Sequence, residues 1–507
     1  MAHSTPAQRR KGGSAPRSAA PTSLPPGIPL WPGVLVTAIC GVVFFSAGVG
    51  RFGFRASQYC HHSMTAYAWT QGRLYCTKDE IQRLFYVQWF ADKRHEKVPP
   101  TVSTDELRTR YREIYEAGWR RSGYTENQIR VQLGRLEKSG MHDWVQLDGR
   151  CYAYWPPVPA LLLLPFVAAV GPGFSDVFFT NLLATLSVWF MYLAVRALKP
   201  HWPELTAPAC AALALLYGLG TCHFYQGTIG QVWYVTQLCG SLFLIIAIWL
   251  GIRAITRPVA IIPAGVALVL GFLSRNTIIL AAPFFAVTLW MAVRVAPDRI
   301  TRFLKYGTGF ALVLIAGIGI QLGFNQARFG DPLDFGQGHL ADAGGNPRFK
   351  EDFAKYGRFN LFYVPRNITS YFLRIPWPWP IKLGHIDYTP HKHPTVPGWT
   401  YDPDGDSLLF LSPAMFYLFL CWRQKRRDLL IAVLAGLLPG TTALMLFHGT
   451  GWYQFGQRYL LDTMAFFVLL AGFGMRGRLS GPAGVLIALS VAMNAWGTYR
   501  FGLEQPP

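Results

Sequence analysis

Five polar residues at or near the ends of apolar runs have side chains suited to binding a phosphate group. They are Arg458, Arg328, Arg275, Tyr459 and Asn325. A guanidinium group can hold phosphate through two parallel hydrogen bonds, and a fixed cation beside a departing phosphate lowers the reaction barrier. Arg458 is the strongest candidate because an apolar run follows it, so its side chain would lie at the depth of a lipid phosphate.

Each arginine also has a purely structural interpretation. Arg458 could extend to the membrane surface or pair with Asp462. Arg328 could pair with Asp331, and Arg275 could anchor its helix at the interface. The sequence leaves these alternatives open.

Proton transfer requires a base, and the catalytic candidates are His62, His61 and Asp148. No aspartate or glutamate occurs between residues 51 and 78, whereas neutral imidazole is a competent base near pH 7. The alternative for the histidine pair is hydrogen bonding or contact with lipid headgroups. Asp143, Asp79 and Glu80 are other acids of the same loop that folding could bring to the site.

The composition indicates a membrane protein. Of the 507 residues, 51% are hydrophobic and 15% are charged, where a soluble chain carries about 25% charged residues. The net charge of +20 does not indicate nucleic-acid binding, because much of it is divided among the connectors between apolar runs. Positive charge on cytoplasmic connectors, close to anionic lipid, explains it better.

Lysine and arginine fall on every second connector, which predicts an orientation with the amino terminus in the cytoplasm. The pattern predicts a disordered cytoplasmic tail over 1–29 and a first transmembrane helix over 30–50. The remaining divisions are an extracytoplasmic loop with a helical hairpin and a juxtamembrane helix at 51–175, transmembrane helices 2–7 at 176–325, an extracytoplasmic loop at 326–405 and transmembrane helices 8–11 at 406–507. The fold class is therefore an all-α integral membrane protein of about 11 spans.

Within the first loop, Ser103–Glu106 and Thr125–Gln128 have the capping-box pattern that begins a helix. Three cysteines, Cys60, Cys76 and Cys151, share this loop, and one pair could form a disulfide if the loop is extracytoplasmic. No Cys/His spacing typical of a metal site occurs, so we expect no metal ligands and no cofactor. The loosely spaced acids and histidines of 385–406 leave a divalent cation possible but unsupported.

Four short motifs follow one another along the chain. In order they read A-x-A-x-x-x-G-R-L at 66–74, G-x-x-Y-x-x-x-P-P at 149–157, N-x-x-R-F-G-x-P at 325–332 and F-G-x-R-Y-L-x-D at 455–462. From about residue 50 to 465 the chain resembles the bacterial GT-C membrane glycosyltransferases, relatives of the protein O-mannosyltransferases and the aminoarabinose transferases.

The resemblance implies a GT-C-like helix bundle with two large extracytoplasmic loops in the cell inner membrane. It implies transfer of one sugar, with inversion, from a polyprenyl-phosphate-linked donor to an extracytoplasmic glycan, lipid or protein acceptor. The chain departs from the family pattern where an acidic residue is expected near Ser57 or Gln58. The alternatives are therefore a transporter or flippase of lipid-linked sugar, or a non-catalytic relative.

Overall fold

The computed structural model describes residues 27–340, 350–375, 381–383, 386–388, 404–451 and 454–504, so nearly all of the expected tail lies outside the described residues. Within these ranges six helical segments are long and apolar enough to cross a membrane. They are Trp31–Phe52, Asp176–Ala197, Val232–Ala254, Asn276–Val293, Arg299–Phe329 and Arg427–Leu446. About 20 residues of helix cross a bilayer core about 30 Å thick. The chain is thus an all-α, multi-pass membrane protein.

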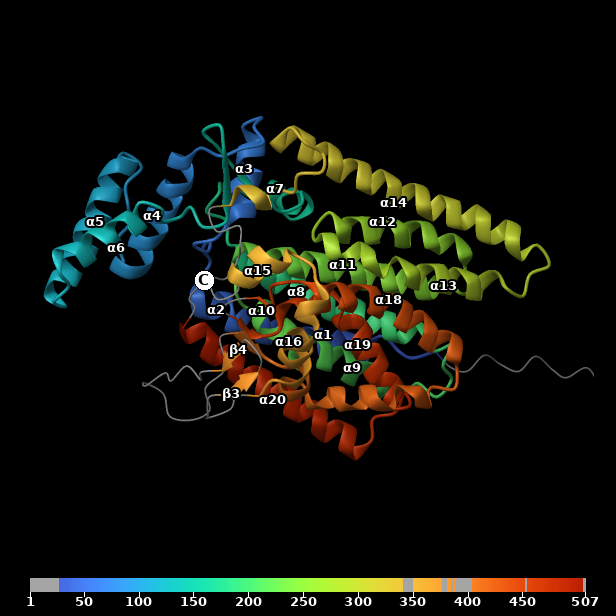
Figure 1. Cartoon of the computed structure of the whole chain (residues 1–507). Helices are drawn as coiled ribbons and strands as arrows, with labels where there is room; N and C mark the ends of the chain where they lie inside the picture. The colour runs from blue at the N-terminus through green and yellow to red at the C-terminus, as the bar shows by residue number, and fades with distance from the viewer. Residues whose placement is uncertain are drawn as a thin grey trace, which may run out of the picture.

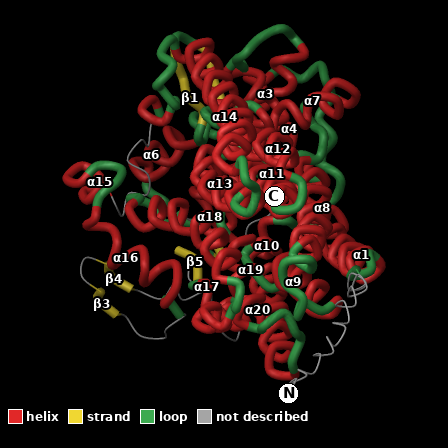
Figure 2. The backbone as a smooth tube through the Cα atoms, turned by 90° about the vertical axis from the view of Figure 1, so that its right-hand side faces the viewer, coloured by secondary structure: helices red, strands yellow, loops and turns green. Residues whose placement is uncertain are grey.

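The bundle is built around α11 (Val232–Ala254), which contacts α8, α12 and α13 (Figure 2). Its apolar residues lie on all sides rather than on one stripe, the pattern of a helix surrounded by protein. The other bundle helices are α1 (Trp31–Ala47), α8 (Asp176–Ala197), α9 (Ala207–Leu219), α12 (Ile261–Phe272), α13 (Ala282–Val293), α14 (Arg299–Phe329), α18 (Arg427–Leu446), α19 (Met464–Gly474) and α20 (Gly481–Glu504).

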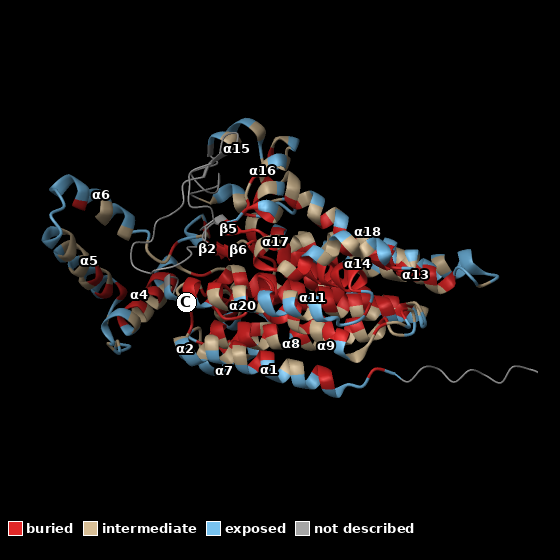
Figure 3. Cartoon of the chain, turned by 90° about the horizontal axis from the view of Figure 1, so that it is seen from below, coloured by how far each residue is buried: buried red, intermediate tan, exposed pale blue. Residues whose placement is uncertain are grey.

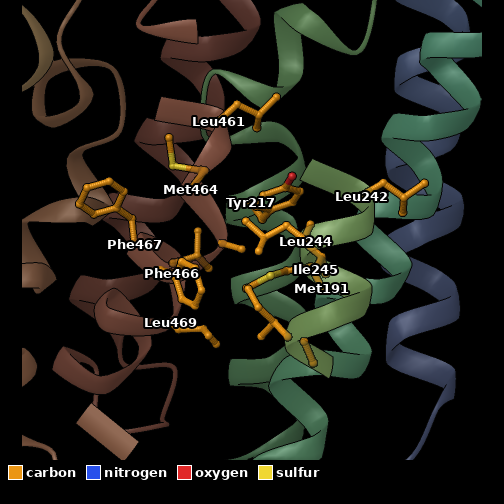
Figure 4. Close-up of a cluster of buried hydrophobic side chains, with 14 of the residues drawn as sticks. Met191, Tyr217, Leu242, Leu244, Ile245, Leu461, Met464, Phe466, Phe467 and Leu469 are labelled. Carbon is orange, nitrogen blue, oxygen red and sulfur yellow. The ribbon is translucent and has the colours of Figure 1, made fainter. Parts of the chain in front are cut away.

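The long helix α14 lies along the edge of the bundle (Figure 1) and leaves apolar side chains such as Leu312 and Ile315 exposed. Exposed aliphatic residues on a membrane-length helix are suited to contact with lipid. The interior, by contrast, is closely packed. Figure 4 shows Met191, Tyr217, Leu244, Leu461 and Phe466 meeting from α8, α9, α11, η8 (Arg458–Asp462) and α19.

The first loop forms a helical unit at one end of the molecule (Figure 1). It contains α4 (Lys78–Arg94), α5 (Thr104–Arg121) and α6 (Glu126–Leu136). Ser103 caps α5 by accepting a hydrogen bond from Glu106 N (3.2 Å), and Thr125 and Gln128 form a reciprocal capping box on α6. Helices α5 and α6 begin at the two capping patterns and consist mainly of exposed and intermediate residues (Figure 3), whereas α4 was not predicted.

A β-hairpin that the sequence analysis missed follows α6. Strands β1 (Trp144–Leu147) and β2 (Arg150–Ala153) pair antiparallel, and Asp148 and Gly149 form the turn with φ of 50° and 73°. Two consecutive residues at positive φ are typical of the tight turn that Asp-Gly favours. The hairpin leads directly into the short segment before α7 (Val158–Val170).

The predicted juxtamembrane helix is α7 (Val158–Val170), and its 13 residues are fewer than a spanning helix requires. It packs against α3 (His61–Thr70) and α11. The start of the interval 406–507, where the sequence predicts transmembrane helices 8–11, is not one membrane-length helix. It forms a short α17 (Leu408–Leu411) and a 3-10 helix, η7 (Pro413–Arg423), in place of one long α-helix.

The remaining elements connect the loops to the bundle. They are α2 (Val49–Phe52), α10 (His223–Gln226), η1 (Pro258–Ala260), η2 (Asn276–Ala281), η3 (Gln337–His339), α15 (Lys350–Tyr356), η5 (Leu361–Tyr363), α16 (Val364–Ile368), the π-helical turn η6 (Thr369–Leu373), β3 (Ile381–Leu383), β4 (Ile386–Tyr388), β5 (Asp404–Asp406) and β6 (Gln454–Gly456). β5 pairs parallel with β6, so the end of the second large loop lies beside the late F-G-x-R-Y-L-x-D motif.

Candidate active site

Arg328 connects two of the four sequence motifs. Its Nη1 donates hydrogen bonds to the carbonyl oxygens of Ala153 (2.5 Å) and Trp155 (3.1 Å). Its Nη2 donates to Asn325 Oδ1 (3.1 Å), and Asn325 in turn donates to Pro332 O. Arg328 and Asn325 therefore fix the end of α14 to the segment after the hairpin. This geometry is that of a structural clamp, not of two side chains free for phosphate.

We expect Arg328→Met to destabilise the protein strongly. The substitution keeps most of the side-chain volume but leaves the buried carbonyls of Ala153 and Trp155 without their donor. Hydrogen bonds to a charged group contribute about 1.5–3 kcal/mol each, so the free energy of unfolding should fall by about 3–5 kcal/mol. Thermal unfolding in detergent measures this loss. Arg130→Met, at an exposed position on α6, is the control, and equal melting temperatures for the two variants would contradict the assignment.

The early motif is also held by an arginine. Arg73 donates two hydrogen bonds to the carboxylate of Glu80, at 3.2 and 2.6 Å. Glu80 accepts a further bond from Thr77 N, which closes the capping box of α4. Gly72, at φ +70°, provides the turn between α3 and this pair. The G-R-L residues therefore fix α4 to the end of α3.

The late motif is held against α11 through its backbone. The carbonyl of Arg458 accepts a hydrogen bond from Gln237 Nε2 (3.1 Å), and Tyr225 donates to the carbonyl of Gly456 (2.9 Å). These bonds fix the backbone of η8 without using the guanidinium group of Arg458. That group lies beside the side chains of Tyr234 and Tyr459.

Asp462 pairs with Arg275, not with Arg458. Arg275 Nε lies 2.7 and 2.5 Å from the two carboxylate oxygens, and Thr277 Oγ1 donates to the same carboxylate (2.5 Å). The ion pair is largely buried, with the Asp462 side chain 3% exposed. This contact excludes the Asp462-paired interpretation of Arg458 and supplies Arg275 with a counter-ion.

Arg458 has no such counter-ion. It is 8% exposed, and within the described ranges no carboxylate pairs with it and its Nε makes no hydrogen bond. The guanidinium carbon lies 5.7 Å from the centre of the Trp233 ring and 5.4 Å from that of Tyr459. Burying an unpaired charge is costly. The arrangement is typical of a site that a bound anion completes.

Phenol groups surround the two arginines. Tyr459 lies between them, because the Arg275 guanidinium is 5.0 Å from the same ring. Burial raises the pKa of Tyr154 well above its ordinary value, while Arg458 and Arg275 lower it. Tyr154 therefore remains protonated at neutral pH and can donate a hydrogen bond. The hydroxyl of Tyr371 is buried, and we find no partner for it among the described residues.

The histidine pair lies in the wall of this region, and the Nε2 atom of each ring makes a hydrogen bond, whereas Nδ1 of His61 is buried and has no partner among the described residues. Thr236 Oγ1 donates to the carbonyl of Val232, so His62 Nε2 must donate to Thr236 (2.7 Å). His61 Nε2 donates to the carbonyl of His142 (2.8 Å), and its ring stacks on a tryptophan. Burial lowers the pKa of His61 to about 4 and that of His62 to about 3. Both rings are neutral at pH 7, 2% and 3% exposed, and better suited to positioning than to proton transfer.

The lowered pKa of His62 predicts a pH-dependent stability. Between the folded pKa of about 3 and the unfolded value of about 6.5, only the unfolded state binds the proton, so stability falls as pH falls. From pH 7 to pH 5 the wild type should lose roughly 2 kcal/mol more than His62→Gln, which cannot titrate. Thermal unfolding at both pH values measures the difference. Equal losses in the two proteins would show that His62 is not buried in its neutral form.

Two acids of the hairpin region have different surroundings. Asp148 is exposed at the turn between β1 and β2. Asp143 accepts a hydrogen bond from Trp233 Nε1 (2.9 Å), and its side chain is 22% exposed. Trp233 therefore contacts Asp143 at its ring nitrogen and Arg458 at its ring system. The structure brings Asp143, not Asp148, to the arginine and tyrosine cluster.

A third acid, Asp176 at the start of α8, lies against Ser57 of the first loop. Its carboxylate accepts hydrogen bonds from Ser57 N (2.7 Å), Ser57 Oγ (2.5 Å) and Gln231 N (3.1 Å). Asp176 is 1% exposed. It therefore anchors the start of the first loop to α8 and to the residue before α11.

No protein-family model and no curated protein sequence matches the chain. Its fold was compared with solved structures, and two crystal structures of the Archaeoglobus fulgidus oligosaccharyltransferase are similar to it. One is the apo form (12% identity, TM-score 0.42), and the other is tethered through a disulfide bond to an acceptor peptide containing the NVT sequon (13% identity, TM-score 0.40). Each match covers 93% of this chain and 55% of the other, so the chain spans about half the length of that protein.

Proposed function

We propose that this chain is a membrane glycosyltransferase that moves a sugar from a polyprenyl-phosphate-linked donor to an extracytoplasmic acceptor. The observation that carries the proposal is the buried Arg458, which has no anionic partner among the described residues. The surrounding phenols and the nearby Arg275 make the same region a set of hydrogen-bond donors. Such a set is suited to a phosphate monoester or diester.

The proposed reaction places negative charge on the departing phosphate group. As the bond between the sugar and the phosphate breaks, negative charge gathers on the phosphate oxygens beside Arg458. A fixed guanidinium in a water-poor site stabilises that charge more than water does. Arg275 is already neutralised by Asp462, so it would contribute donors without adding net charge.

The acceptor must lose a proton as it attacks the sugar carbon. Asp143 is our candidate for the base, because it is partly exposed and shares Trp233 with Arg458. Attack from the face opposite the departing phosphate gives inversion at that carbon. His61 and His62 would position the segment that carries Asp143, because His61 donates a hydrogen bond to the carbonyl of the preceding residue, His142.

The alternation of basic connectors supports an orientation with this region on the extracytoplasmic side of the cell inner membrane. The partners are then the polyprenyl-phosphate-sugar, whose chain would lie against apolar helices, and a glycan, lipid or protein acceptor. The proposed chemistry requires neither nucleic acid nor a cofactor.

A transfer assay tests the proposal. The purified full-length protein in liposomes receives polyprenyl-phosphate hexoses or pentoses together with an extract of cell-envelope acceptors. We expect release of free polyprenyl phosphate and appearance of the sugar, with inverted configuration, on an acceptor or on water. Movement of the intact lipid-linked sugar between leaflets without bond cleavage would instead favour a flippase.

A further inference from the structure

The three cysteines of the first loop lie together, although two of them are 75 positions apart in the sequence. Cys60, Cys76 and Cys151 belong to one buried cluster that also contains Met64 and Trp144. Their exposed fractions are 6%, 1% and 2%. The proposed reaction uses none of these thiols.

Cys76 and Cys151 are paired directly through their backbones. Cys76 N donates to Cys151 O (2.9 Å), and Cys151 N donates to Cys76 O (3.0 Å), which makes an isolated antiparallel bridge. The Cα atoms of such a hydrogen-bonded pair lie about 5.5 Å apart, and disulfides join Cα atoms about 4.4–6.8 Å apart. The two side chains leave the same face of the bridge.

Cys60 has a different position. It precedes the first turn of α3, and its sulfur lies 3.9 Å from Gln88 Nε2. It takes no part in the bridge. The thiols of Cys76 and Cys151 are free in the structure, where Cys76 Sγ donates a hydrogen bond to the carbonyl of Met64 (3.3 Å). The backbone bridge nevertheless brings these two cysteines together and leaves Cys60 outside it.

We propose that Cys76 and Cys151 form a structural disulfide and that Cys60 remains a free thiol. The inference requires the first loop to lie in an oxidising compartment, and it does not depend on the reaction that the protein catalyses. The disulfide would link the segment after α3 to β2. Because Arg328 binds the carbonyl of Ala153 at the end of β2, the same link would extend to the end of α14.

The oxidation is a thiol–disulfide exchange with an external disulfide, such as that of an oxidoreductase. One cysteine, as thiolate, attacks the external disulfide and forms a mixed disulfide with release of one thiol. The second cysteine attacks the mixed disulfide, forms the Cys76–Cys151 bond and releases the second thiol. Two electrons and two protons pass to the external disulfide.

Once the loop has folded, burial makes both thiols poorly reactive in thiol–disulfide exchange. It raises the pKa of Cys151 to about 11 and raises that of Cys76 further, so both are protonated at neutral pH. Exchange requires the thiolate. The bond should therefore form while the loop folds and should resist reduction afterwards, as a structural disulfide does.

Peptide mapping of the full-length protein tests the pairing. Membranes are treated with N-ethylmaleimide in denaturant without reductant, and tryptic peptides are identified by mass spectrometry. Trypsin separates the three cysteines, because Arg73 and Lys78 flank Cys76 and Arg150 precedes Cys151. We expect a linked Cys76–Cys151 peptide and an alkylated Cys60. Alkylation of both Cys76 and Cys151, or a link from either one to Cys60, would overturn the proposal.

Four serine variants provide a second test. Cys76→Ser and Cys151→Ser should lower the melting temperature by similar amounts, and the double variant should be no less stable than either single one. Reductant applied during unfolding should lower the melting temperature of the wild type and of Cys60→Ser but not that of the double variant. Additive losses in the double variant, with no effect of reductant on the wild type, would show two independently packed thiols.

Discussion

Arg458→Lys should lose most of the transfer activity while retaining its charge. Lysine places a point charge on a flexible stem and cannot reproduce the planar fork that binds two phosphate oxygens. Removing one fixed donor from a water-poor site costs about 2.7–4 kcal/mol of barrier, which corresponds to a hundred- to thousand-fold loss in rate. Turnover per folded molecule, measured as polyprenyl phosphate released, gives the result.

The matched control is Arg253→Lys. Arg253 is exposed and lies over a tryptophan ring, with its guanidinium carbon 5.1 Å from the ring centre, but it is outside the candidate site. Its turnover should stay close to that of the wild type. If Arg458→Lys also retained wild-type turnover at equal amounts of folded protein, Arg458 would not hold the departing phosphate.

Asp143→Asn should lower turnover by a factor of about 10² to 10⁴, the contribution typical of a positioned base. The change removes the proton-accepting charge and little else. Asp143 has φ of 60°, a conformation that asparagine also tolerates, and the amide oxygen can still accept the bond from Trp233. Substrate binding should be nearly unchanged, so kcat should fall much more than KM rises.

Asp148→Asn is the control for this prediction. Asp148 lies only five positions away, and asparagine before glycine suits the same turn. The variant should fold normally and keep its activity. The opposite outcome, a large loss at Asp148 and none at Asp143, would mean that the exposed turn approaches the substrate and that our choice of base is wrong.

The sequence predicts local features of the fold, such as helix starts, better than it predicts contacts between distant segments. The helix starts at Ser103 and Thr125 follow from capping patterns, which need only neighbouring residues. The β-hairpin was missed although Asp148-Gly149 is a known turn signal, because its strands are only four residues long. The apolar composition of Pro413–Arg423 predicts a membrane span, but the segment forms a 3-10 helix.

The site depends on contacts between distant segments, which the sequence does not encode locally. Arg275 and Asp462 are 187 positions apart, so the sequence could suggest only that Asp462 pairs with its neighbour Arg458. Trp233 and Asp143 are 90 positions apart, and no motif marks either one. Arg328 was a reasonable candidate for phosphate by type, yet its contacts with two carbonyls emerge only in the folded chain.

The position near Ser57 has no acid in the sequence, but the carboxylate of Asp176 lies directly against Ser57. Because three donors surround that carboxylate, it stabilises the loop. Asp143, an acid from a different part of the loop, is partly exposed and is therefore our candidate for the base.

The most direct test of the proposed function is a cryo-electron microscopy structure of the full-length protein with a polyprenyl monophosphate bound. We expect phosphate oxygens about 3 Å from the guanidinium nitrogens of Arg458, next to Tyr459, with the lipid chain along the apolar helices. A phosphate bound elsewhere, with the Arg458 side chain unchanged and still without an anion, would contradict it.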